Sequence, residues 1–159
     1  MMFGGQGLLM ATNVVVSYRY WRLQVTANNG GAFTYIPEFK LLVGVTEYPP
    51  NMISNTSPSP YVISGNTSSG QPFQSVNGAL NNTGVWAAGT CDLIIDMGSA
   101  IIPTGYFINS GSWSGANLPN TWTVSGSTTG SFSGEETIKN SQSGQTFPTT
   151  NLRKDYTIP

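Results

Sequence analysis

Few side chains in this sequence could carry out acid–base chemistry. The chain has 159 residues, with seven Asp and Glu, six Lys and Arg, and no His. One acidic pair is Asp92 and Asp96; if residues 92–97 form a strand, the two carboxylates share a face about 13 Å apart. That exceeds the spacing of the catalytic carboxyl groups of glycosidases, roughly 5 to 9.5 Å. Glu135 and Glu136 lie in a Gly- and Ser-rich segment, where we expect solvated loop charges, so we predict no catalytic residue.

The absence of histidine excludes several chemistries at once. Ser–His–Asp and Cys–His catalysis and an HExxH zinc site all require it. The single cysteine, Cys91, excludes an intrachain disulfide and a cysteine-rich metal cluster, and we expect it to be a buried thiol. A net charge of −1 argues against binding to nucleic acid. No apolar run is long enough to span a membrane. We therefore predict a non-enzyme with no nucleic-acid partner and no membrane insertion.

Aromatic residues give a better basis for a binding site. Trp113 lies among small polar residues in the segment NSGSWSGAN, residues 109–117. Such a tryptophan is either a lid over the end of a β-sandwich or an exposed contact residue, and Asn117 would add hydrogen bonds beside it. Sugars stack apolar C–H faces on aromatic rings and bind amide groups through their hydroxyls. The candidate ligand-binding residues are Trp113, Asn117, Asn77 and Trp86, which we expect to be half-buried.

The remaining sequence predicts short β-strands separated by turns rich in Gly, Pro and Asn. Residues 18–26 (YRYWRLQVT) alternate with a period of two, which places Trp21, Leu23 and Val25 on the core face. Trp122 is also expected in the core, and Asp96 is expected to cap a turn at Gly98. The other predicted strands are residues 39–45, 61–64, 73–76, 92–97 (ended by Gly98), 101–108, 121–125, 137–138 and 155–158. No segment has helical periodicity, and only 8% of residues are charged, against about a quarter in typical proteins. We predict one all-β domain, a sandwich, jelly roll or barrel, with a tendency to self-associate.

Residues 1–17 (MMFGGQGLLMATNVVVS) precede the first predicted strand. A signal peptide needs a basic start and an uninterrupted apolar core. Here the first positive charge is Arg19, and glycines interrupt the apolar run, so we expect no cleaved signal. The segment is either a flexible tail or an arm that docks on a partner. The apolar contacts of such an arm would be Phe3, Leu8, Leu9 and Met10.

Five motifs occur in a consistent cyclic order along residues 18–158. They are Arg19-Tyr20-Trp21-Arg22-Leu23 followed by Glu38-Phe39-Lys40-Leu41-Leu42, then Ser75-Val76-Asn77-Gly78, Ile95-Asp96-Met97-Gly98, Gly105-Tyr106-Phe107-Ile108, and Pro119–Ser127 (PNTWTVSGS). Together they resemble the discoidin-like domain, also called the coagulation-factor type C or galactose-binding-like domain. The resemblance implies a jelly-roll β-sandwich over residues 18–159, preceded by the N-terminal arm of residues 1–17.

The order of the motifs carries further information. In most members of that family the strand resembling residues 19–23 comes last, whereas here it comes first. The resemblance therefore implies a circularly permuted domain, which is tolerable where the chain ends lie close together. Residues 18–26 would then lie in the middle of a sheet, of the same chain or of a neighbouring one. Similar openings occur in bacteriophage virion proteins, which suggests a virion protein.

Many members of the family hold a structural calcium ion near the turn that corresponds to residues 75–78. Calcium takes six to eight oxygen ligands, with carboxylates prominent among them. In this sequence Asn77 stands in place of the aspartate of that turn, and Thr129 in place of the acidic residue of a second turn. Backbone carbonyls and Asn77 could still supply some ligands, so the loss of both acids weakens a calcium site without excluding it. We predict no cofactor and no metal ligands.

Three functional hypotheses follow. The first is a structural or accessory protein of a bacteriophage virion, a capsid decoration or a neck or tail component, assembled in the host cytoplasm and exposed on the virion surface. Its partners would be other virion proteins, further copies of itself and host-surface glycans. The second is a purely structural subunit that binds no sugar. The third is a carbohydrate-binding module of a secreted glycan-degrading system, which the lack of a signal and a linker disfavours.

Overall fold

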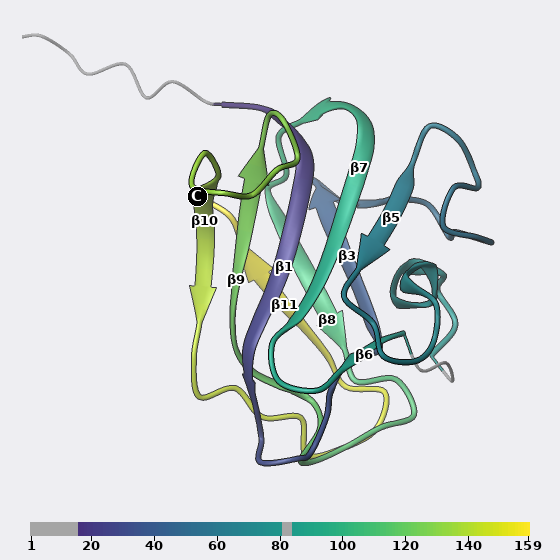
Figure 1. Cartoon of the computed structure of the whole chain (residues 1–159), viewed down its shortest axis with the longest axis vertical. Helices are drawn as coiled ribbons and strands as arrows, with labels where there is room; N and C mark the ends of the chain where they lie inside the picture. Colours follow the sequence, from purple (N-terminus) through teal and green to yellow (C-terminus); the bar gives the residue numbers. More distant parts are fainter. Residues whose placement is uncertain (1–15, 81–83) are drawn as a thin grey trace, which may run out of the picture.

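The computed structural model describes residues 16–80 and 84–159 and shows an all-β sandwich (Figure 1). One sheet has the order β10-β9-β1-β7-β5, formed by Thr137–Gln142, Pro119–Ser127, Tyr18–Asn28, Cys91–Ile101 and Val62–Gly65. The other has the order β11-β8-β3-β4, formed by Arg153–Thr157, Gly105–Asn109, Glu38–Val43 and Thr46–Tyr48. A two-stranded ribbon joins β2 (Thr34–Ile36) to β6 (Val85–Ala87). Within the described residues, no helix has the length and apolar character needed to cross a membrane.

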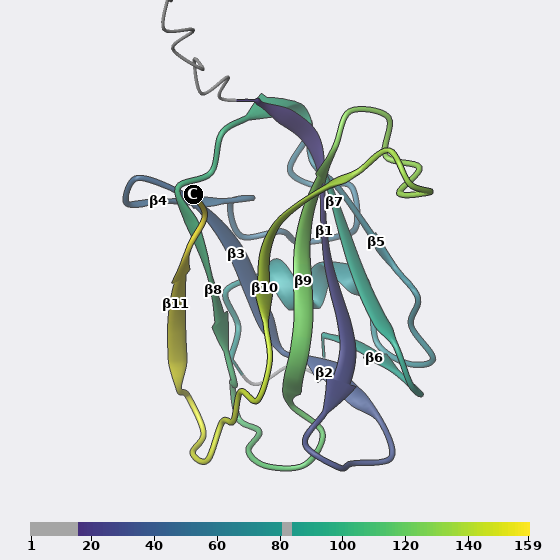
Figure 2. The ribbon, with the colours of Figure 1, turned by 90° about the vertical axis from the view of Figure 1, so that its left-hand side faces the viewer.

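The two larger sheets face each other and enclose the hydrophobic core (Figure 2). Strand β1 lies in the middle of the five-stranded sheet, between β9 and β7, which is the position that the resemblance implied, and it pairs within its own chain. Its alternation places Trp21, Leu23 and Val25 in the core with almost no exposed surface. The predicted core face of residues 18–26 is therefore confirmed, and so is the first strand residue, Tyr18.

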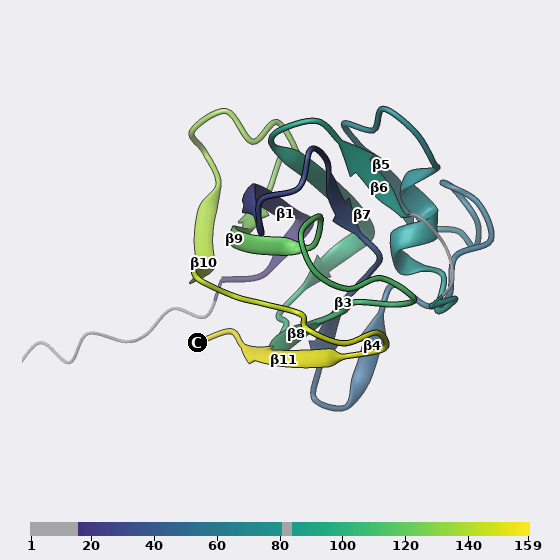
Figure 3. The same cartoon turned by 90° about the horizontal axis from the view of Figure 1, so that it is seen from below.

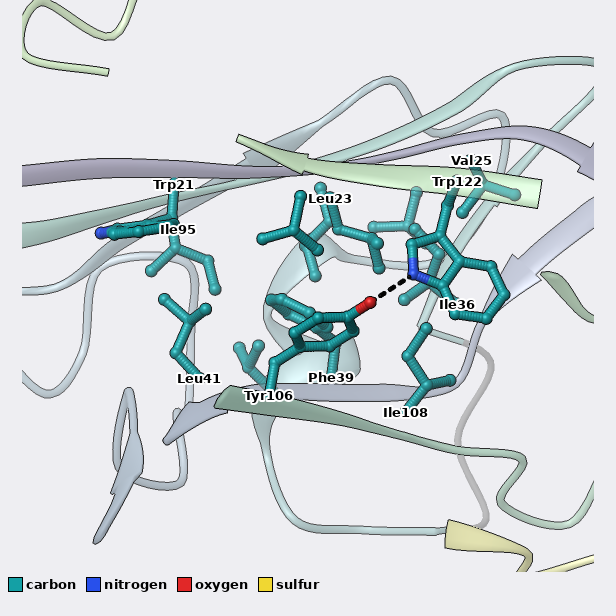
Figure 4. Packing of buried hydrophobic residues seen from close by; sticks show 14 of the residues in the cluster. Trp21, Leu23, Val25, Ile36, Phe39, Leu41, Ile95, Tyr106, Ile108 and Trp122 are labelled. Carbon is teal, nitrogen blue, oxygen red and sulfur yellow. Dashed lines mark hydrogen bonds between the residues drawn. The ribbon is translucent and has the colours of Figure 1, made fainter. Parts of the chain in front are cut away.

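A short hydrogen-bonded chain links the two sheets through the core. The indole Nε1 of Trp122, on β9, donates to the hydroxyl of Tyr106, on β8, at 2.9 Å (Figure 4). That hydroxyl donates in turn to Oδ1 of Asn140, on β10, at 2.7 Å. The ring of Tyr156 stacks on Tyr106 with 5.0 Å between centroids. Because buried polar atoms are costly when unpaired, these bonds allow an indole and a phenol to lie in the core.

One predicted strand is wrong. Residues 73–76, expected to be extended, belong to a 3₁₀ helix, η1 (Pro72–Val76). Pro72 at the first position favours a helix start because its missing N–H would have no partner there. The backbone N–H of Gln71 donates to Oε1 of Gln74 at 2.8 Å, and this bond holds the first turn closed.

Several predicted strand ends also differ from the structure, and three of them lie near a glycine or a proline. Strand β7 does not stop at Gly98 but continues to Ile101. Gly98 has a φ of +74° at an irregularity where the pairing of β7 with β1 shifts register, a conformation that glycine adopts without strain. Strand β8 begins only at Gly105, because Pro103 lies in the connection that precedes it, and β3 ends at Val43, where a turn at Gly44 leads into β4.

Candidate functional site

Three connecting segments meet at one end of the sandwich, the lower end in Figure 1. They are residues 29–33 after β1, 110–118 between β8 and β9, and 143–152 between β10 and β11. Figure 3 looks at this end from below. The middle segment is hydrogen-bonded on both sides: Gly31 N donates to the Ala116 carbonyl at 3.0 Å, and Gly115 N donates to the Phe147 carbonyl at 3.1 Å. We call these three segments the loop end.

Four aromatic side chains gather beside the middle segment and on the β2–β6 ribbon. Tyr35 lies at the centre, 5.1 Å from Trp86 in an edge-on arrangement and 4.9 Å from Trp113 in a tilted one, measured between ring centroids. Phe33 packs edge-on against Trp86 at 4.9 Å and is 37% exposed. Tyr35 is buried, whereas Trp86 and Trp113 are half-buried. We call Phe33, Tyr35, Trp86 and Trp113 the aromatic cluster.

Both indole N–H groups of the aromatic cluster lack a hydrogen-bond partner. Nε1 of Trp86 and Nε1 of Trp113 are each buried, and neither bonds to any other described residue. An unpartnered buried donor costs about 1–3 kcal/mol, so such groups are few in native structures. The cluster therefore combines exposed ring surface with two donors that nothing in the described part of the chain satisfies.

Asn117 holds this arrangement together. Its carbonyl accepts from Tyr35 N at 2.8 Å, and its Oδ1 accepts from Phe33 N at 3.5 Å. A Cβ atom on Gly31 would lie only 1.8 Å from Asn117 Oδ1, so the chain at residue 31 can be nothing larger than glycine. Asn117 thus positions Phe33 and Tyr35. Within the described residues its Nδ2 donates no hydrogen bond and remains available to a ligand.

A shallow depression of about 180 Å³ lies among the three segments of the loop end. Its lining residues are Asn29, Gly115, Ala116, Thr146, Phe147 and Pro148. Phe147 is buried, whereas Thr146 is exposed. The amide of Asn29 is engaged internally: its Nδ2 donates to the Leu118 carbonyl at 3.0 Å. The depression is thus mainly apolar, with a hydroxyl at its rim.

The sequence grouped four ligand-binding candidates, and the structure brings three of them together: Trp86, Trp113 and Asn117. The fourth, Asn77, is occupied in its own turn, where its Oδ1 accepts from Ala79 N at 2.9 Å. Sequence reasoning missed Phe33 and Tyr35. Their spacing of two in Phe33-Thr34-Tyr35-Ile36 is a strand signal that could have revealed a shared aromatic face.

The implied calcium site does not fit the residues around the turn at Asn77. Beneath that turn lies the carboxylate of Glu38, whose Oε1 accepts from Gly78 N at 3.0 Å. The ammonium of Lys40 lies 3.9 Å from the same oxygen. A divalent cation bound there would meet a positive charge at close range. Within residues 16–80 and 84–159, no group of three His, Cys, Asp or Glu side chains is placed to hold a metal ion. In the second turn, the hydroxyl of Thr129 donates a hydrogen bond to Oε1 of Glu135.

Most of the acidic side chains named above are engaged in local contacts. Asp96 accepts from Gly98 N at 2.8 Å, but at an irregularity within β7 rather than at the predicted turn, and it also accepts from Arg19 at 2.7 Å. The Arg19 guanidinium and that N–H lower the pKa of Asp96. Glu135 accepts from three hydroxyl groups of its own loop, which lower its pKa, and Glu136 pairs with Arg22 at 2.8 Å.

Cys91 and Asp92 are the first two residues of β7. Asp92 Oδ1 is buried and has no partner among the described residues. Cys91 is a buried free thiol, as predicted, and burial raises its pKa to about 12. A thiol with so high a pKa is a poor nucleophile, because the thiolate is the reactive form.

Searches against known proteins found no relative. No protein-family model, curated protein or solved structure matches this chain. The resemblance to discoidin-like domains thus rests on the sequence motifs alone. The predicted arm contacts, Phe3, Leu8, Leu9 and Met10, lie outside the described residues.

Proposed function

We propose that this protein is a non-enzymatic adhesion subunit whose loop end binds glycans. The observation that carries the proposal is the aromatic cluster, which pairs an exposed ring, Phe33, with two buried indole donors that lack partners. Ring surface stacks on the apolar C–H face of a pyranose, and hydroxyl oxygens accept from N–H groups. The Nδ2 of Asn117 and the depression beside Gly115 would serve the rest of the sugar.

The shallowness of the site sets the expected mode of binding. A ligand that buries little surface binds weakly, so a single site would have millimolar affinity. Many copies on one particle would raise the overall affinity through the high effective concentration of neighbouring sites. The site therefore suits a protein displayed in many copies.

We further propose that the displaying particle is a bacteriophage virion. The support is the motif order, which resembles a circularly permuted, jelly-roll discoidin-like domain of virion proteins. The central place of β1 in its own sheet fits that arrangement. The low charge, 8% of residues, favours contacts with other virion proteins and with further copies of the chain. The segment of residues 1–17 would be the docking arm, in a capsid decoration or a neck or tail component.

A glycan array probed with an artificially multimerised form of the protein tests the glycan site. The wild type should give sugar-specific signals that Phe33→Ala and Trp113→Phe abolish. The matched control is Ile138→Ala, which removes another exposed apolar side chain, on β10, and should leave the signals unchanged. Silence of the wild type would contradict glycan binding and would favour the purely structural subunit.

Deletion of residues 1–17 tests the arm separately. The shortened protein should fold, bind the same glycans and fail to join its assembly, as measured by sedimentation of assembled particles. Unchanged incorporation would contradict a docking role for Phe3, Leu8, Leu9 and Met10.

A further inference from the structure

The end of the sandwich opposite the loop end carries exposed apolar side chains. Val16, Val43, Val45 and Ile102 are between 37% and 98% exposed, and Val45, in the turn between β3 and β4, is the most exposed of them. Turns are normally built from Gly, Pro, Asn, Asp and Ser, so a fully exposed valine in a tight turn is unusual. We call these four residues the apolar end patch.

Strand pairing brings the first and last members of the patch to the same end of the molecule (Figure 2). Tyr18 at the start of β1 pairs with Ile101 at the end of β7. The chain therefore enters β1 from Val16 and leaves β7 through Ile102 at one end of the five-stranded sheet. Residues 102–104 then cross to β8 in the other sheet.

The same connection is bonded to the turn that holds the other two members. The N–H of Thr104 donates to the Leu42 carbonyl at 2.7 Å, and its hydroxyl accepts from Gly44 N at 3.0 Å. Gly44 lies between Val43 and Val45 in the chain. The apolar end patch thus extends over the ends of both sheets, with Thr104 tying its two halves together.

The charged side chains nearest to the patch along the chain are already paired. Arg19 lies 2.7 Å from Asp96, and Glu47 lies 2.8 Å from Arg153. Exposed apolar side chains that gather in one place are typical of a contact surface. A partner with an apolar, uncharged segment therefore suits this patch best.

The segment that joins the sandwich at this end has that character. Residues 1–15 lie outside the described residues, and their sequence contains no Asp, Glu, Lys or Arg. Residues 8–10 (LLM) precede Val16 by six to eight positions, and a chain of that length spans up to about 25 Å. That length allows them to reach the patch of an adjacent copy. The net charge of −1 opposes the approach of two copies only weakly.

We propose that residues 1–15 of one copy bind the apolar end patch of a neighbouring copy, so that the protein self-associates by exchanging its arms. The proposal rests on the docking role proposed above for residues 1–17 and names a second copy of this chain as the partner. The driving force is the removal of apolar surface from water on both sides of the contact. Because the contact is apolar, association should not weaken between 50 mM and 1 M NaCl.

Analytical ultracentrifugation of full-length variants tests this proposal. The wild type should self-associate. Leu9→Asp, which alters the arm, and Val45→Asp, which alters the patch, should each weaken the association at least about tenfold. Because Val45 is 98% exposed, its replacement should leave the fold intact. The matched control is Ile53→Asp, which changes a side chain that is 76% exposed but lies between β4 and β5, and it should associate like the wild type.

A mixture of the two variants distinguishes exchange between copies from other arrangements. Leu9→Asp keeps an intact patch and Val45→Asp keeps an intact arm, so the equimolar mixture should associate more strongly than either variant alone. A monomeric wild type, or a mixture that associates no better than its components, would overturn the proposal. If the mixture fails while deletion of residues 1–17 still prevents incorporation into particles, the arm docks on a different protein and only its docking role stands.

Discussion

The four tryptophans of this chain divide into two pairs that differ in how their N–H groups are used. In the core, Nε1 of Trp21 donates to the Tyr18 carbonyl at 3.1 Å, and Nε1 of Trp122 donates to the Tyr106 hydroxyl at 2.9 Å. Both rings are almost completely buried, and both N–H groups are satisfied within the chain.

In the aromatic cluster, the indole N–H groups of the other two tryptophans have no hydrogen-bond partner within the described residues. The rings of Trp86 and Trp113 pack against Tyr35. Their Nε1 atoms are buried but form no hydrogen bond with any described residue. Within the described residues, the chain itself thus satisfies the N–H groups of the two core tryptophans, whereas it leaves those of Trp86 and Trp113 without a partner. This difference, rather than burial, separates structural tryptophans from candidate contact residues.

The largest effect is expected from truncating a core tryptophan. Trp122→Ala should lower the free energy of unfolding by about 3–5 kcal/mol, because it leaves a cavity and removes the partner of the Tyr106 hydroxyl. Trp113→Ala should cost less than half as much, because that ring is only half-buried. Urea unfolding of both variants measures the difference, and equal losses would remove the distinction between the two pairs.

The next largest effect concerns Glu38, a buried polar group with one partnered and one unpartnered oxygen. Burial raises its pKa from 4.5 to about 7, and Glu47 adds to the rise, whereas Lys40 and the N–H groups of the turn oppose it. Between these values the folded state holds a proton that the unfolded chain has released, so stability falls as the pH rises from 4.5 to about 7. The loss should reach up to about 3 kcal/mol.

Urea unfolding at a series of pH values measures this loss, with Glu38→Gln as the control that removes it. The other resolved carboxyl shifts do not compete in this window. The pKa values of Asp96, Glu135 and Glu136 are lowered, so their contributions are lost only at more acidic pH. A wild-type stability that stays flat from pH 4.5 to 7 would contradict the raised pKa.

A matched pair of tryptophan-to-phenylalanine changes isolates the N–H group from the ring. Trp122→Phe breaks the bond to Tyr106 and should cost about 2 kcal/mol. Trp113→Phe removes a donor that has no partner, so its stability should change by less than about 1 kcal/mol, while glycan binding is lost. If Trp113→Phe were as destabilising as Trp122→Phe, its N–H would have a structural role.

The smallest effect on stability is expected for Phe33→Ala. Because Phe33 is 37% exposed and packs mainly on Trp86, the variant should lose less than about 1 kcal/mol. Its glycan binding should nevertheless disappear, as judged by the array. Retained binding would place the sugar elsewhere than on the aromatic cluster.

The sequence predicted those parts of the fold that depend on local alternation. Residues 18–26 have a period of two, and both their strand and their core face were predicted correctly. Strands β2 and β6 were not predicted, because each has three residues and is defined by the pairing of Tyr35 with Trp86, 51 positions apart in the sequence. No local pattern contains that information.

The candidate site was predictable only in part for the same reason. Trp113 stood out because its sequence neighbours are small and polar, and Trp86 because it follows the polar segment of residues 81–84. Their common neighbour, Tyr35, could not be predicted from the sequence, because its contact with Trp86 depends on the pairing of β2 with β6. Lys40 was placed in a predicted strand, but its burial depends on Asn51 and on the turn at Gly78, which come from distant parts of the chain.

The central claim, that the aromatic cluster is a glycan site, is tested most directly on the indole N–H groups. A ¹H–¹⁵N correlation spectrum shows one such signal per tryptophan, and single Trp→Phe variants assign them. During titration with free galactose, glucose, mannose and N-acetylglucosamine, the signals of Trp86 and Trp113 should shift with at least one sugar, while those of Trp21 and Trp122 stay fixed. If all four signals remain unmoved with every sugar, or all four move together, the claim is contradicted.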